Sequence, residues 1–120
     1  MKNLNIYINK LKNFDTPTIC NGMELIDSKY KLNHYTKKPF FCLYPKLKPM
    51  VGFAKTATIK STKSNNARLS DIRIPYYEYV NKDKIPKISV VEDLISNPIG
   101  SFWGEVNANI HYKLGCLGVL

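Results

Sequence analysis

The sequence of residues 87–120 is KISVVEDLISNPIGSFWGEVNANIHYKLGCLGVL, and this stretch decides the fold class. Residues Lys87 to Val91 form a short run rich in β-branched side chains, which predicts a buried strand. A helix is expected over residues 101–114, with Gly115 as its stop. Residues 117–120 begin another strand. A strand, loop, helix and strand in this order predict a layered α/β fold.

The residues upstream extend the same pattern. Alternation over residues 50–62 predicts a strand, and the polar residues 61–66 predict a loop. We expect a helix after this loop, and Pro75 should limit how far upstream it extends. The apolar side of that helix would carry Ile72, Tyr76, Tyr79 and Val80.

The N-terminal part is expected to be helical and then irregular. Residues 4–13 carry a weak apolar stripe at helical spacing. Asp15 is a cap candidate two residues before Pro17, which predicts the start of a second helix that ends near Asp27. Prolines and the lack of periodicity predict a long connection over residues 28–49.

These elements predict one domain over residues 1–120, with N-terminal helices and a loop in 1–49 and the start of an α/β core in 50–120. The last residues look like the first half of a central strand, so we expect the domain to be truncated inside that strand.

Composition excludes several classes of protein. With 44% hydrophobic and 22% charged residues, the 120-residue chain has the balance of a globular domain. It contains no apolar run of about 18 residues and no secretory leader, so neither a membrane partner nor export is expected. The cysteines Cys20, Cys42 and Cys116 form no CxxC pair. We expect buried thiols in a reducing, cytoplasmic setting.

The net charge of +9 suggests a nucleic-acid partner, but the residue types argue against one. Sixteen of the eighteen basic residues are lysine, whereas base-reading and phosphate-clamping surfaces favour arginine. Lysine, asparagine and isoleucine all have AT-rich codons, so genome composition explains the charge more simply.

The chemistry is expected where the last predicted helix begins. Backbone N–H groups and the helix dipole at such a start favour an anion, for example a carboxylate. Gly104 would let a ligand approach the backbone closely. Glu105 could orient a metal-bound water or transfer a proton. A glycine before a helix with an early glutamate is also ordinary capping, and the spacing alone leaves that alternative open.

Three segments in order along the chain resemble the RraA-like family, which includes 4-hydroxy-4-methyl-2-oxoglutarate aldolases and a regulator of ribonuclease E. They read DTPTICN from Asp15, PMVGFAKTATI from Pro49, and FWGEVNANIH from Phe102, the last followed by LGCLGV. The resemblance implies the swivelling β/β/α fold and a homotrimer or hexamer.

The resemblance also implies an activity. It points to a metal-dependent class II pyruvate aldolase, a lyase that cleaves 4-hydroxy-2-oxo dicarboxylates and has oxaloacetate decarboxylase side activity. Such chemistry generates an enolate, which a divalent cation and an arginine stabilise. Magnesium or manganese suits a site of carboxylate and water oxygens. The alternatives are a non-catalytic module that regulates a ribonuclease, and an inactive fragment.

The site residues carried over by resemblance are Gly104, Glu105, Val106 and Asn107 for the substrate. Glu105 is also the expected catalytic residue and would hold the metal through water. The Arg-Asp pair of the family, with the main metal aspartate, is expected beyond Leu120.

The remaining polar and aromatic residues are expected to serve the structure. His34 and His111 are more consistent with surface or supporting positions than with catalysis. Trp103 and Phe102 are expected in packing, and the tyrosines of residues 76–79 in a helical core stripe. Asp93 is expected to cap a loop.

Overall fold

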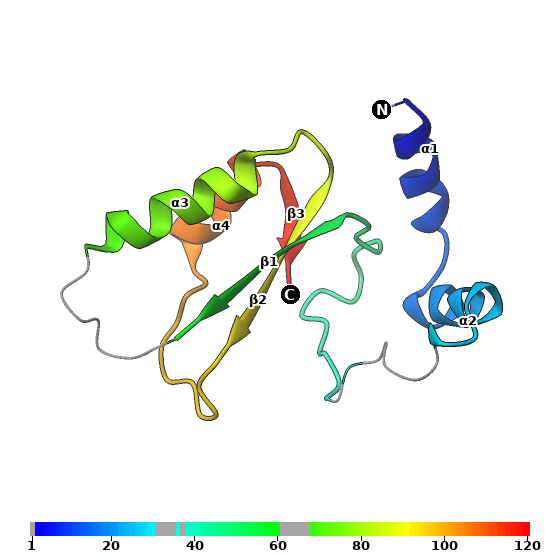
Figure 1. Cartoon of the computed structure of the whole chain (residues 1–120), viewed down its shortest axis with the longest axis horizontal. Coiled ribbons are helices and arrows are strands. Elements are labelled where there is room, and N and C mark those ends of the chain that lie inside the picture. Colours follow the sequence, from blue (N-terminus) through cyan, green and yellow to red (C-terminus); the bar gives the residue numbers. More distant parts are fainter. Residues whose placement is uncertain (1, 31–35, 37, 61–67) are drawn as a thin grey trace. The chain divides into compact units, whose positions relative to one another are not determined.

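A computed structural model of the chain describes residues 2–30, 36, 38–60 and 68–120 (Figure 1). It divides into two compact units, Met1–Pro49 and Met50–Leu120. The second unit is an α/β unit with a three-stranded parallel sheet in the order β1-β2-β3. The predicted α/β class is therefore confirmed. The predicted connection at residues 61–66 and His34 lie outside the described residues.

The N-terminal unit carries two helices, α1 (Lys2–Leu11) and α2 (Thr16–Ile26). The predicted start of α2 is confirmed. The Asp15 carboxylate accepts a hydrogen bond from the Thr18 amide at 2.8 Å, and a proline occupies the first turn. This bond lowers the pKa of Asp15 below its usual value. The helix ends where expected, with Asp27 as its C-terminal cap.

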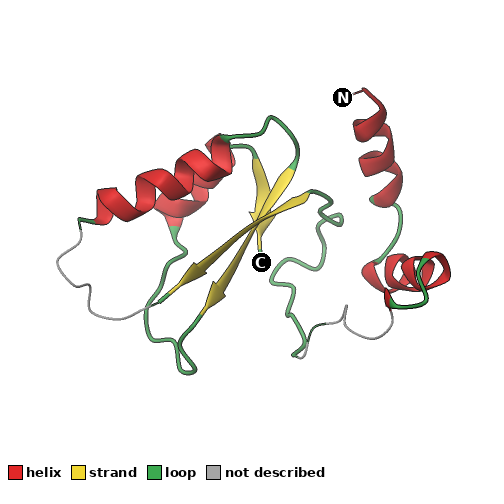
Figure 2. Cartoon of the chain, in the orientation of Figure 1, coloured by secondary structure: helices red, strands yellow, loops and turns green. Residues whose placement is uncertain are grey.

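In the second unit the strands are β1 (Phe53–Ile59), β2 (Lys87–Asp93) and β3 (Cys116–Val119). β1 and β2 pair in parallel along their whole length, from Phe53 opposite Lys87 to Ile59 opposite Asp93. β3 pairs with the other edge of β2 through one irregularity in register. Figure 2 shows the three strands of the sheet together, in yellow.

The helices α3 (Leu69–Asn81) and α4 (Glu105–Lys113) form the two crossovers between these strands. Right-handed crossovers in the strand order 1-2-3 place both helices on one face of the sheet. Figure 1 shows them side by side there. α3 contacts the face of β2 that carries Lys87 and Ser89, and Tyr76 of α3 also contacts His111 of α4.

Two helix starts differ from the sequence-based prediction. α3 begins at Leu69 and runs through Pro75, which was expected to limit its upstream extension. Proline removes one helical hydrogen bond and crowds the preceding turn, at about 3 kcal/mol, so packing along α3 must offset that cost. α4 begins at Glu105, four residues later than expected, and residues 101–104 form an irregular segment before it.

The end of α4 follows the prediction. Gly115 has φ +85°, a left-handed conformation that glycine adopts without strain. Its amide donates to the Tyr112 carbonyl at 3.0 Å, which closes the helix and turns the chain into β3.

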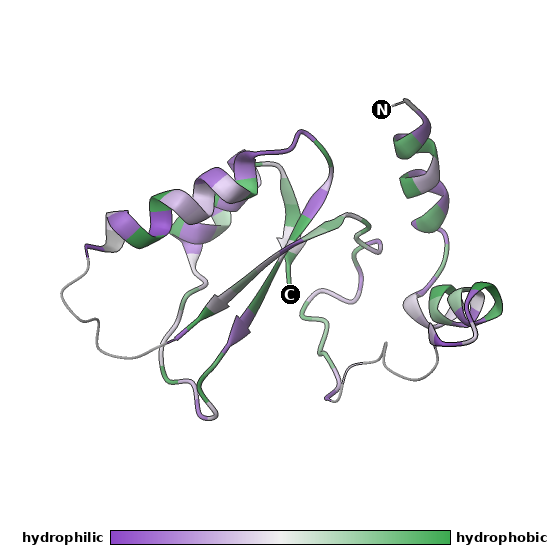
Figure 3. Ribbon diagram, in the orientation of Figure 1, coloured by the Kyte–Doolittle hydropathy of each residue, from purple (hydrophilic) through white to green (hydrophobic). Residues whose placement is uncertain are grey.

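Only three apolar side chains are buried among the described residues: Ile8, Val80 and Cys116. Figure 3 shows apolar segments on α1 and α2 and along the strands. The expectation of buried cysteines is correct for Cys116 only. Cys20 is half-buried, and Cys42, which lies in an irregular segment, is exposed. Burial raises the pKa of the Cys116 thiol.

No helix among the described residues is both long and apolar enough to cross a bilayer.

Candidate functional site

The predicted site lies at the start of α4. Gly104 is the N-cap residue, its backbone is extended, and no side chain caps the helix end. The space where a Cβ of residue 104 would stand is open, with no atom within 4 Å. Glu105 and Val106 are exposed on the first turn. A ligand can therefore reach the first-turn amides and the Glu105 carboxylate from solvent.

Topology places this turn at a favourable edge of the sheet. In parallel α/β folds the loops that leave the carboxyl ends of the strands carry the ligand sites. The chain leaves β2 after Asp93 and enters α4 at Glu105, so the start of α4 follows such an end. The Asp93 carboxylate accepts from the Ile95 amide at 3.0 Å at the start of this loop, as expected for a loop cap.

Asn107 differs from the other three predicted site residues because it is buried, at 7% exposure. Its side-chain amide donates to the Phe102 carbonyl, and its side-chain oxygen accepts from the Tyr77 hydroxyl at 2.7 Å. Both ends of the side chain are thus bonded within the protein. Asn107 connects the approach to α4 with α3.

His111 lies one turn further along α4 and is 2% exposed. Its Nδ1 is 2.7 Å from the Asn107 carbonyl, which can only accept, so Nδ1 carries the hydrogen. In the neutral ring Nε2 then accepts from the Tyr76 hydroxyl, at 2.7 Å. The Tyr76 oxygen in turn accepts from Ser89 of β2, at 2.9 Å. This chain of bonds joins the sheet to both helices.

Aromatic rings surround the imidazole of His111. The Trp103 ring is closest, with 4.5 Å between centroids, and Tyr76, Tyr77 and Phe102 follow at 5.6, 5.9 and 6.4 Å. Trp103 and Phe102 therefore pack, as predicted, while His111 supports the fold from inside. Desolvation raises the pKa of Tyr76, and the hydrogen bond with Ser89 opposes that effect.

A second buried polar group lies at the other end of α3. Lys87 is 2% exposed, and its Nζ donates to the carbonyls of Val80 and Asp83 at 2.7 and 2.6 Å. The Val80 carbonyl is in the last turn of α3 and the Asp83 carbonyl follows the helix end, where a cation also interacts favourably with the helix dipole. Lys55 of β1 forms an ion pair with the Asp83 carboxylate. The hydrogen bond from Lys55 lowers the pKa of Asp83.

This second cluster has the features of a structural group. Each ammonium has partners within the protein, and the Lys55 Nζ also lies 4.8 Å from the centre of the Tyr79 ring. Of the predicted α3 stripe, Val80 is fully buried and Tyr76 half-buried, but Ile72 and Tyr79 are exposed. Tyr77, also predicted in the core stripe, is half-buried and bonds to Asn107 of α4.

The residues around Glu105 do not by themselves make a metal site. Among the described residues no group of three or more histidine, cysteine, aspartate or glutamate side chains is close enough to hold an ion. Glu105 offers one exposed carboxylate, whereas a firmly held magnesium or manganese ion needs several oxygen ligands. The described residues thus lack a complete donor set.

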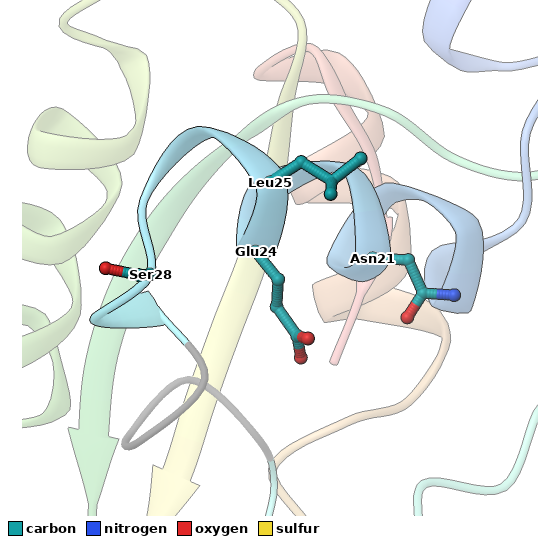
Figure 4. A pocket seen from close by; sticks show the side chains of 4 residues that line it. All are labelled: Asn21, Glu24, Leu25 and Ser28. Carbon is teal, nitrogen blue, oxygen red and sulfur yellow. The ribbon is translucent and has the colours of Figure 1, made fainter.

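A shallow hollow on α2 is lined by Asn21, Glu24, Leu25 and Ser28. Figure 4 shows that these four side chains do not converge on one point. Glu24 is the only ionisable group among them, so the hollow offers no pair of groups for acid–base or metal chemistry.

Of the four predicted site residues, Gly104, Glu105 and Val106 are exposed and Asn107 is turned inward. The sequence did not predict this inward orientation or the bond from Tyr77 to Asn107. Asn107 and His111 are four residues apart on one helix, and this spacing was the available signal. Comparison of the chain with protein-family models, with curated proteins and with solved structures gives no match.

Proposed function

We propose that the protein belongs to the RraA-like family, has its swivelling β/β/α fold, and acts as a metal-dependent class II pyruvate aldolase on 4-hydroxy-2-oxo dicarboxylates. The observation that carries the proposal is the start of α4. There an uncapped glycine and an exposed glutamate follow the carboxyl end of a parallel strand. Gly104 and Glu105 also lie within the third of the segments that resemble the family.

Anion binding at this turn follows from the backbone. The first-turn amides and the positive end of the helix dipole favour a carboxylate or an enolate oxygen. The net charge of +9 adds an attractive field for dianionic substrates. These groups act on charge that develops during the reaction, which is where electrostatic stabilisation has its largest effect.

Glu105 is the proposed proton-transfer group. In a retro-aldol cleavage the 4-hydroxyl loses its proton, the C3–C4 bond breaks, and the bonding electrons pass to the 2-oxo group to form the pyruvate enolate. Glu105, directly or through a water molecule, takes the hydroxyl proton and returns a proton to C3 of the enolate. Correctly placed groups of this kind contribute roughly 10²–10⁴-fold to rate.

A divalent cation would add charge stabilisation to the enolate oxygen. Because the described residues lack a complete donor set, the steps above use only the groups of this chain. The proposed Arg-Asp pair would follow β3, and the loop after a parallel strand emerges at the same edge as the loop after β2.

The proposal predicts that the protein exchanges the methyl protons of pyruvate with solvent, because the enolate is reached from either direction. In D₂O with added Mg²⁺ and pyruvate, NMR should show loss of the methyl signal at a rate proportional to protein concentration. The Glu105→Gln variant should exchange no faster than buffer. Equal exchange with and without protein would count against enolate chemistry at this site.

A further inference from the structure

We infer that Asn107 and Tyr77 are positioning residues that fix the Trp103–Glu105 turn, so that Glu105 points at the substrate from a rigid support. The inference rests on the proposed function and names the residues that hold its site. It also assigns Asn107 a different task from that of its exposed neighbours, because its side chain is buried and both of its polar atoms bond within the protein.

The Asn107 side chain holds the backbone just before α4 in place. Its side-chain nitrogen donates to the Phe102 carbonyl, five residues back, and so fixes the backbone just before Trp103 and Gly104. Gly104 has no side chain, so the helix start receives no other side-chain cap. The direction in which the chain enters α4 therefore depends on Asn107.

Tyr77 in turn holds the Asn107 side chain in place. Its hydroxyl donates to the Asn107 side-chain oxygen at 2.7 Å. The Phe102 carbonyl can only accept, so the end of the amide that faces it is the nitrogen. Without this bond, a buried amide oxygen would have no partner, and the amide could rotate to find one. Tyr77 is on α3, so the bond transfers the position of one crossover helix to the other.

The His111 ring packs against Trp103, which lies in the turn that Asn107 holds. The centre of the His111 ring lies 4.5 Å from that of Trp103, with the two planes tilted by 48°, and the ring is itself held by Tyr76 and by the Asn107 carbonyl. The two consecutive tyrosines of α3 thus hold two residues of α4 that are one turn apart. Glu105, exposed beyond this support, needs such a fixed base, since a misplacement of about 1 Å can lower a rate on the order of a hundredfold.

The test uses Tyr77→Phe, which removes one hydroxyl and keeps the ring. Trp103 is the only tryptophan among the 120 residues, so its emission reports on the turn directly. We expect emission at longer wavelength and stronger quenching by acrylamide, with an unchanged far-UV circular dichroism spectrum. We also expect kcat for pyruvate release to fall roughly ten- to hundredfold while KM changes little.

The matched control is Tyr112→Phe, because Tyr112 is on α4 and is 73% exposed. This variant should keep the wild-type emission and kinetics. Asn107→Leu should reproduce the effects of Tyr77→Phe, and adding Tyr77→Phe to it should change nothing further, since residues that act as one unit are not additive.

The outcomes separate the two proposals. Wild-type emission in Tyr77→Phe, equal to that of Tyr112→Phe, would overturn the positioning role, as would fully additive effects of Tyr77→Phe and Asn107→Leu. An emission change in a protein that releases no pyruvate would support the fixed turn and reject the aldolase proposal alone.

Discussion

Replacing Glu105 with glutamine is expected to lower kcat for pyruvate release by roughly a hundredfold or more, with little change in stability. Glutamine keeps the shape of the side chain but cannot take up the proton of the substrate hydroxyl. Glu105 is exposed and has no described partner whose loss would unfold the helix, so the free energy of unfolding should change by no more than about 0.5 kcal/mol. Steady-state kinetics and urea denaturation measure the two quantities.

The matched control for this variant is Glu78→Gln. Glu78 is likewise an exposed glutamate on a crossover helix, in α3, away from the start of α4. It should keep wild-type kinetics. If Glu105→Gln and Glu78→Gln were equally active, the proton-transfer role of Glu105 would be rejected.

Replacing Lys87 with methionine is expected to produce the largest loss of stability, about 3 kcal/mol. Methionine fills a similar volume but leaves the carbonyls of Val80 and Asp83 without the donor that they have in the native protein. An unsatisfied buried acceptor costs about 1–3 kcal/mol. The end of α3 also loses the cation that interacts with its dipole. Urea denaturation followed by far-UV circular dichroism measures the change.

Lys84→Met provides the comparison, because Lys84 is exposed and only three residues away in sequence. Its free energy of unfolding should stay within about 0.5 kcal/mol of the wild-type value. Equal effects of the two substitutions would show that Lys87 contributes only general charge and does not cap α3.

Local rules predicted the elements whose causes are local. Asp15 followed by Pro17 predicts the start of α2, because a carboxylate cap and the fixed φ of proline both act within one turn. Gly115 predicts the end of α4, because few other residues adopt φ +85° without strain. The strand at Lys87 was recognisable from its β-branched run.

Tertiary contacts decided the rest. Pro75 would end an isolated helix, but α3 passes through it, and the neighbouring Tyr76 and Tyr77 bond to β2 and α4. Before the start of α4 at Glu105, the Phe102 carbonyl accepts from the Asn107 side chain and the Trp103 carbonyl from the Ser101 hydroxyl, so side chains bond to the backbone in this non-helical segment. Periodicity along one segment carries no information on such partners.

The candidate site divides in the same way. Gly104 and Glu105 were predictable because a glycine and an acidic residue at a helix start have a local meaning. The burial of Asn107, His111 and Lys87 was not, because polar residues are exposed by default and become buried only where partners exist. Tyr77 is 30 residues from Asn107 in sequence, and Tyr76 is 35 residues from His111. The Val80 carbonyl is seven residues from Lys87.

We propose that the full-length protein, with the expected Arg-Asp pair, is a metal-dependent pyruvate aldolase. The most direct measurement is pyruvate release from 4-hydroxy-4-methyl-2-oxoglutarate by that protein. Release is followed by reduction of the pyruvate with NADH and lactate dehydrogenase, with added Mg²⁺ and again with excess EDTA. We predict steady release with Mg²⁺ that stops with EDTA and returns when Mg²⁺ is restored. No release with either Mg²⁺ or Mn²⁺, from a protein shown by circular dichroism to be folded, would contradict the claim.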